Sequence, residues 1–218
     1  MWLGDNFMPK FNQNGISDLR VDHSNANIYF LADSVLYKID ATNSQRKWRL
    51  LLDHIPNVPP VSQLYKWHIA GQIDNKSVLR HGKHVIAMVD NVNGHHLWIN
   101  QQHNNIVRTV ITSSHTITLT DNYQLSFIDN TNGTTVNQID LSKNLPATLN
   151  MPPTINIQWF NYINNQIMLV ANDTLMAFNS KTLKLTKITN MPNNFAEMIA
   201  HNNKIFAITS NGEVYRWQ

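Results

Sequence analysis

One short pattern, present in five copies, constrains this chain more than any other feature of its sequence. Each copy is an apolar stretch that ends in Asp, Asn or Gln, and the complete copies continue into a polar turn. The anchor residues are Asp40, Asp90, Asp129, Asn179 and Gln218, which are separated by 50, 39, 50 and 39 residues. The pattern predicts a β-strand that enters a tight turn once in every unit of about 44 residues.

Further apolar runs surround each anchor. Two lie upstream, one follows the turn, and connections such as TDNY and TSNG are made of residues that accept turn geometry. Four short antiparallel strands in a unit of this length are typical of a β-propeller blade. We therefore predict an all-β chain, a single β-propeller domain over residues 1–218 with five four-stranded blades. The predicted repeats are 16–54, 62–103, 104–143, 152–190 and 194–218.

The fifth unit stops after its third strand. The N-terminal segment 1–15, and within it the stretch Trp2 to Phe11, is predicted to supply the missing strand and to pair the two chain ends. The alternative is that the chain is a fragment or arc of a seven- or eight-bladed propeller. The alternating spacing also suggests duplication of a two-blade unit.

Composition excludes several classes of function. Charged residues are 14% of the chain, the formal net charge is +3, and no basic run points to nucleic acid or to an anionic membrane. The absence of Cys excludes disulfides and cysteine chemistry. No apolar stretch has the length of a membrane-spanning helix, and the first residues lack a signal-peptide pattern. The compartment is predicted to be the periplasm or cell envelope if a signal peptide was removed, and otherwise the cytoplasm.

Two repeats have a Trp eight residues after the anchor. These are IDATNSQRKW, which ends at Trp48, and VDNVNGHHLW, which ends at Trp98. This pattern resembles the pyrroloquinoline-quinone-like repeat of a β-propeller family, in which the Trp packs between adjacent blades. The third and fourth units depart from it, with Asn137 and Lys187 at the Trp position.

Two kinds of protein share this repeat. The quinone-dependent dehydrogenases of the family are larger and carry a calcium site and often a vicinal disulfide, which this chain without Cys does not match. The noncatalytic scaffolds of outer-membrane protein assembly ask only for a rigid ring and an interaction surface. The resemblance therefore implies a scaffold with no catalytic residues and no cofactor.

Candidate chemical sites are few. Asp40, Asp90 and Asp129 precede turns, so we expect their carboxylates to accept backbone hydrogen bonds and stabilise those turns. Five histidines gather in the second unit, but their positions at both ends of one strand argue against a metal site, and they are predicted to be exposed turn residues. These histidines are His81, His84, His95, His96 and His103.

Proline-rich segments after the first and third units are the predicted interaction surface, because blade-to-blade loops carry function in propellers. The predicted apolar anchors for a protein partner are Ile55, Val58, Leu145, Leu149, Met151 and Met191. The sequence thus favours a noncatalytic scaffold, and the resemblance suggests an envelope assembly or secretion complex as its setting. A carbohydrate-binding (lectin-like) or glycan-cleaving propeller is the alternative, and so is a reduced quinoprotein-like enzyme.

Overall fold

The computed structural model describes residues 16–22, 24–32, 34–56, 58, 66–144, 157–171, 173–182, 184–192, 194–201 and 204–217. These residues form 19 β-strands and two short 3-10 helices. Within the described part of the chain, no helix is long and apolar enough to cross a membrane.

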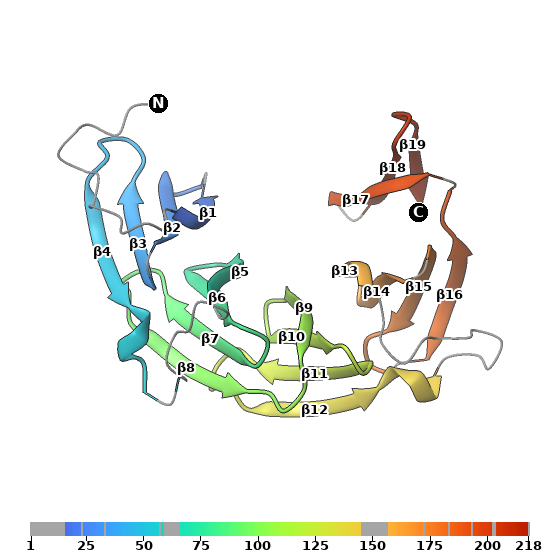
Figure 1. Ribbon diagram of the computed structural model, residues 1–218, viewed down its shortest axis with the longest axis horizontal. Coiled ribbons are helices and arrows are strands. Elements are labelled where there is room, and N and C mark those ends of the chain that lie inside the picture. Colours follow the sequence, from blue (N-terminus) through green and yellow to red (C-terminus); the bar gives the residue numbers. More distant parts are fainter. Residues whose placement is uncertain are drawn as a thin grey trace. The chain divides into compact units, whose positions relative to one another are not determined.

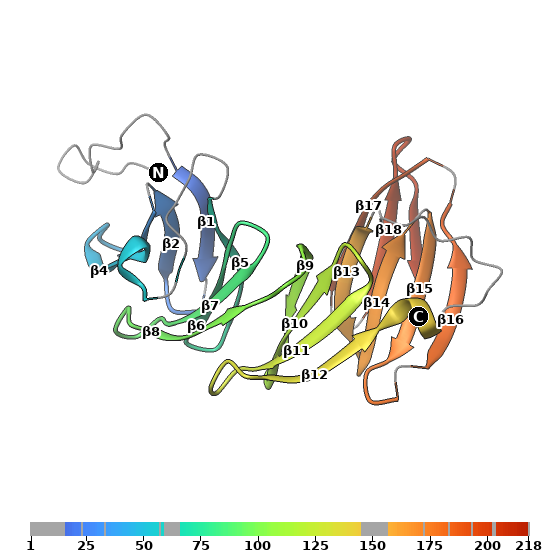
Figure 2. The same ribbon diagram turned by 60° about the horizontal axis from the view of Figure 1, so that its bottom comes forward.

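The strands form five antiparallel sheets, and in each sheet consecutive strands are neighbours (Figure 1). Sheet 1 contains β1 (Ile16–Asp22), β2 (Asn27–Ala32), β3 (Val35–Asp40) and β4 (Arg46–Leu51). Sheet 2 contains β5 (Trp67–Ile73), β6 (Lys76–His81), β7 (Val85–Asp90) and β8 (His96–Gln101). Sheet 3 contains β9 (Ile106–Ile111), β10 (His115–Thr120), β11 (Gln124–Asp129) and β12 (Thr135–Asp140). Sheet 4 contains β13 (Ile157–Ile163), β14 (Gln166–Ala171), β15 (Thr174–Asn179) and β16 (Leu185–Asn190), which Figure 2 shows side by side. Sheet 5 contains β17 (Phe195–His201), β18 (Lys204–Thr209) and β19 (Val214–Trp217).

Burial explains why apolar runs become the two central strands of each sheet. All six residues of β2 are buried, and the four central residues of β3 are buried too. Such strands have both faces covered and lack the alternation of a half-exposed strand. The edge strand β4 instead alternates, with Trp48 and Leu50 half-buried and their neighbours exposed.

The chain forms two compact units. The first comprises Met1–Asn105, Ser113–Thr116 and Ile128–Val136, and the second comprises Ile106–Thr112, Ile117–Phe127 and Asn137–Gln218. A core around Leu36, Leu79 and Ala87 lies in the first unit. The second unit has one core around Leu119 and Phe178 and another around Val170 and Ala207.

One backbone hydrogen bond ends each four-stranded sheet. The residue directly after the fourth strand donates its N–H to the turn between the second and third strands, over 2.7 to 3.0 Å. The four pairs are Leu52 with Ser34, Gln102 with His84, Leu141 with Tyr123, and Met191 with Asp173. The proline-rich segments therefore begin at fixed points, where the 3-10 helices η2 (Leu52–His54) and η3 (Leu141–Asn144) each start with a buried leucine.

The predicted strand pattern is confirmed. Four units contain four antiparallel strands, and the fifth contains three within the described residues. The segment 1–15, predicted to complete the fifth unit, lies outside the described residues.

Candidate functional site

Three of the repeated anchor residues hold their turns in the same way. The Asp40 carboxylate accepts the Thr42 N–H at 2.8 Å, and Asp90 and Asp129 accept the N–H groups two residues further on at 2.8 and 2.6 Å. Hydrogen bonds from Thr42, together with Lys47 at 3.1 Å, lower the pKa of Asp40 to about 2. Each carboxylate thus makes the hydrogen bond expected of a turn-stabilising residue.

A second hydrogen bond, repeated with the same geometry, completes these turns. Asn43, Asn93 and Asn132 each accept, through the side-chain oxygen, the N–H two residues on at 2.9 Å. These residues were not predicted, although their constant place three residues after the anchor was a visible signal. Part of the large number of Asn residues in this chain therefore has a structural role in turns.

Trp48 and Trp98 each bond a turn of the next sheet, and all of these residues lie in the first unit. The indole N–H of Trp48, on sheet 1, donates to the Asn91 carbonyl in the turn of sheet 2 at 3.1 Å. Trp98, on sheet 2, donates to the Asn130 carbonyl in the turn of sheet 3 at 3.0 Å. Each ring lies over the glycine of that turn, where a Cβ would approach it to within 2.7 Å at Gly94 and 2.6 Å at Gly133.

Asn91 is the centre of a buried hydrogen-bond network. Its carbonyl accepts a second bond from the Lys38 ammonium at 2.6 Å, and its side-chain oxygen accepts the Ser77 hydroxyl at 2.8 Å. Burial is the largest cause that lowers the pKa of Lys38, followed by the nearby Lys47. Asn91 itself is only 3% exposed.

The first strands of neighbouring sheets are joined by charged side chains. Asp18 on β1 accepts the Ile69 N–H of β5 at 2.8 Å, while Arg20 donates to the Ile69 carbonyl at 3.2 Å. The two side chains also form an ion pair at 3.4 Å. In the second unit Arg108 on β9 donates in a similar way to the Ile157 carbonyl of β13. These contacts are charge-assisted and local to each pair of sheets.

The predicted partner anchors are only partly accessible, and two of them are corrected. Ile55 is 3% exposed because η2 turns it back onto the core of the first unit. Met191 is 7% exposed and belongs to a core of the second unit. Its N–H donates to the Asp173 carbonyl, and this bond holds the Met191 side chain against that core. Val58 is half-buried against the first core. Leu145, Leu149 and Met151 lie outside the described residues.

Exposed apolar side chains occur instead on the edge strand β1. Ile16, Leu19 and Val21 are 48%, 47% and 45% exposed. Edge strands that carry exposed apolar side chains offer both hydrophobic contact and unpaired backbone groups. The sequence alone did not reveal this surface, because the alternating pattern of β1 does not say whether its apolar face is covered.

The five histidines of the second unit differ in their exposure. No group of three potential ligands comes together among the described residues. His95, His96 and His103 are exposed, as expected. The expectation for His81 is corrected, because it is 3% exposed and its ring lies 4.8 Å from that of Trp67.

Comparisons with known proteins identify the fold. No family model matches the chain, and no curated protein matches it. Among solved structures, BamB from Moraxella catarrhalis has a TM-score of 0.61 at 13% identity, covering 88% of this chain and 54% of that one. The Pan2 WD40 domain of Neurospora crassa has a TM-score of 0.60 at 10% identity, covering 91% of this chain and 60% of that one. BBS1N, solved in complex with ARL6DN, has a TM-score of 0.63 at 14% identity, covering 92% and 60%.

This chain thus spans little more than half of the length of the solved chains it matches. At such low identity the likeness shows the fold alone. Together with the five antiparallel sheets, it establishes that the chain has an all-β, β-propeller fold.

Proposed function

We propose that this chain is a noncatalytic β-propeller scaffold of the pyrroloquinoline-quinone-like repeat type, and that it binds a protein partner. The observation that carries the proposal is the exposed apolar row Ile16, Leu19 and Val21 on the edge strand β1. Apolar side chains grouped on one exposed element are typical of protein interaction sites. The carboxylates that repeat in the sequence support it as well, because turn hydrogen bonds already occupy them.

The proline-rich segments provide the second part of the proposed surface. They contribute Val58 after sheet 1, and Leu145, Leu149 and Met151 after sheet 3. The resemblance of the repeats around Trp48 and Trp98 to those of the scaffold members of the pyrroloquinoline-quinone-like family suggests a partner in an envelope assembly or secretion complex. The likeness to BBS1N, whose structure contains ARL6DN, supports protein binding by this fold.

Affinity purification tests the proposal. The tagged chain is crosslinked in its native cells, and the recovered proteins are quantified by mass spectrometry for the wild type and for three variants. Leu19→Asp should remove the stoichiometric partner, and the double variant Leu145→Asp, Met151→Asp should weaken its capture. Val92→Asp is the matched control, because Val92 is 64% exposed and lies in the turn after β7, not on β1.

The variants must first show the circular dichroism and the unfolding midpoint of the wild type. Equal capture of the partner by folded Leu19→Asp would exclude the β1 surface. Recovery of the chain alone from crosslinked cells would contradict the scaffold function itself. Recovery of a cytosolic partner would agree with the scaffold function but would exclude an envelope complex as its setting.

A further inference from the structure

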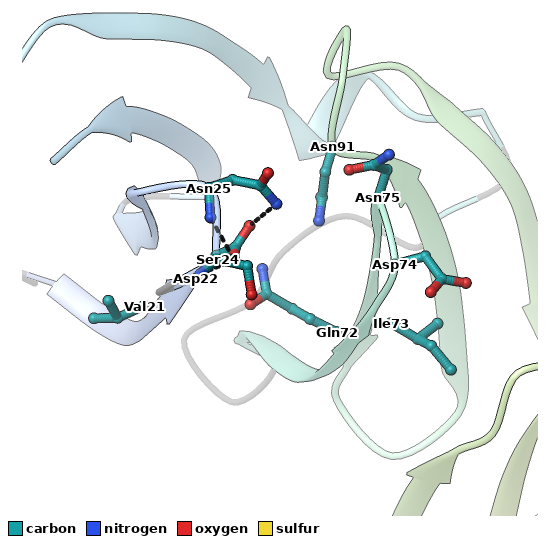
Figure 3. A pocket seen from close by; sticks show the side chains of 9 residues that line it. All are labelled: Val21, Asp22, Ser24, Asn25, Gln72, Ile73, Asp74, Asn75 and Asn91. Carbon is teal, nitrogen blue, oxygen red and sulfur yellow. Dashed lines mark hydrogen bonds between the residues drawn. The ribbon is translucent and has the colours of Figure 1, made fainter.

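A polar cavity of about 690 Å³ lies in the first unit, next to the turn between β1 and β2 and the turn between β5 and β6 (Figure 3). Seven of its nine lining residues have amide, carboxyl or hydroxyl side chains, and the other two are Val21 and Ile73. Its volume is within the range of about 300 to 1,000 Å³ that is usual for small-ligand sites.

A relay of hydrogen bonds fixes the orientation of Asn91 at the cavity wall. Gln72 Nε2 donates to Ser77 Oγ at 3.1 Å, and Ser77 Oγ donates to Asn91 Oδ1 at 2.8 Å. Ser77 Oγ thus accepts from Gln72 and uses its single hydrogen to donate to Asn91. The relay therefore identifies Oδ1 as the buried end of the Asn91 amide and Nδ2 as its other end.

Asn91 Nδ2 is a donor aimed into the cavity. Figure 3 shows this nitrogen at the free end of the Asn91 side chain, which lies between the side chains of Asn25 and Asn75. Asn91 is 3% exposed, and the structure records no acceptor for Nδ2 in the described part of the chain. This nitrogen is not among the described buried atoms that lack a hydrogen-bond partner, so it reaches the solvent side of the cavity wall. An acceptor atom on a bound ligand would take the place of water there.

Two side-chain oxygens of the cavity lining are available as hydrogen-bond acceptors. Asn25 Nδ2 donates to Asp22 Oδ2 at 2.9 Å, which leaves Asn25 Oδ1 for a ligand. Gln72 uses its nitrogen in the relay, which leaves Oε1 for a ligand in the same way. Asn91, Asn25 and Gln72 thus offer one donor and two acceptors, a combination that suits groups able both to donate and to accept, such as hydroxyls.

The charges and the apolar surface of the cavity restrict the class of ligand further. Asp22 and Asp74 are the charged residues among the described lining, so anions are disfavoured. Ammonium and guanidinium groups have no acceptor for the Asn91 donor. The aliphatic side chains of Val21 and Ile73 provide surface for C–H groups. We propose that this cavity binds a neutral saccharide ring, held by Asn25, Gln72 and Asn91, a function distinct from the scaffold role although Val21 belongs both to the cavity wall and to the β1 surface.

Nuclear magnetic resonance tests this proposal on the full chain. Glucose, galactose, mannose and N-acetylglucosamine are titrated separately to about 20 mM, a range that detects millimolar affinity. At least one sugar should shift the Asn91 side-chain amide resonances in a saturable way. Asn25→Ala and Gln72→Ala should each lower the affinity for that sugar at least about tenfold, which is the effect of losing one well-placed hydrogen bond.

Gln45→Ala is the matched control, because Gln45 is a surface amide of the first unit whose side chain does not line the cavity. It should bind the sugar as the wild type does. No shift with any of the four sugars overturns the proposal, and so does a shift that survives in both cavity variants. Acetyl-lysine methylamide and acetyl-arginine methylamide are titrated in parallel, and saturation by these basic probes without sugar binding would overturn it as well.

Discussion

The indole of Trp48 lies so close over Gly94 that a Cβ on this glycine would be 2.7 Å from Trp48 Cδ2. Gly94 also has φ of +75°, in the left-handed region that favours glycine. Two requirements therefore coincide at one residue, the backbone of the turn and the space for a ring from the neighbouring sheet.

Gly94→Ala should lower the free energy of unfolding by about 2 to 4 kcal/mol, because backbone strain and steric overlap with Trp48 add. Gly212→Ala is the matched control, since Gly212 has φ of +87° but no described atom within 4 Å of the position that a Cβ would take. It should cost about 1 kcal/mol, the backbone part alone. Urea denaturation of both variants measures the difference, and equal losses would show that the ring contact has no energetic importance.

Lys38 and Trp48 share one acceptor, the Asn91 carbonyl. Lys38 pairs with Trp48 across the strands as Met88 pairs with Trp98 in sheet 2, so Lys38→Met copies the neighbouring sheet. We expect it to change the free energy of unfolding by less than about 1 kcal/mol, because the Trp48 donor remains and a buried charge is removed. Trp48→Phe should cost about 1 to 2 kcal/mol.

The double variant Lys38→Met, Trp48→Phe tests this sharing. It deprives the Asn91 carbonyl of both side-chain donors, so its loss should exceed the sum of the single losses. A double-mutant cycle by urea denaturation checks the coupling, and strict additivity would contradict a shared acceptor.

Acid should destabilise the turn that contains Asp40. The folded pKa of this carboxyl is about 2, against 3.8 for the unperturbed group. A pKa that is lower in the folded state means that the unfolded chain binds more protons, so the stabilisation is present above pH 3.8 and is lost as the pH falls toward 2. Asp40→Asn should flatten the pH dependence of the unfolding midpoint in this window. An unchanged acid slope would show that Asp40 does not contribute to it.

Asp18 should protect a single amide of the neighbouring sheet, because its carboxylate accepts the Ile69 N–H. Asp18→Ala should speed hydrogen exchange at Ile69 by about tenfold, which corresponds to about 1.4 kcal/mol, with little change elsewhere on β5. Arg20→Ala serves as the control, since it removes the bond to the Ile69 carbonyl but leaves the acceptor of the N–H. Equal acceleration in the two variants would argue that β1 protects β5 only by covering it.

The sequence predicts those features that repeat in a fixed register. The anchors Asp40, Asp90 and Asp129 and the residues Trp48 and Trp98 could be placed because each stands at a fixed position in a repeated short pattern. Ile55 and Met191 were misplaced because a loop residue next to a strand can be drawn into the core by one backbone hydrogen bond, as the Met191 N–H shows.

The cavity was beyond prediction for another reason. Asn25, Gln72 and Asn91 come from three different turns and strands, and nothing in their spacing states that they meet. The orientation of the Asn91 amide depends on Ser77, which lies on yet another strand. Such a constellation follows from the packing of one sheet on the next, which a periodic pattern does not encode.

The hydrogen bond that follows each fourth strand makes the architecture of the sheet independent of the length of the segment after it. The Leu52 and Leu141 N–H groups bond the turn between the second and third strands of their own sheets. Each sheet is complete at that point, and the number of residues that follow does not change it. Loop length adds only slowly to the entropy cost of folding. Segments after sheets 1 and 3 should therefore tolerate grafted peptides or whole inserted domains, so that selection can change what this propeller recognises without rebuilding the sheets that display it.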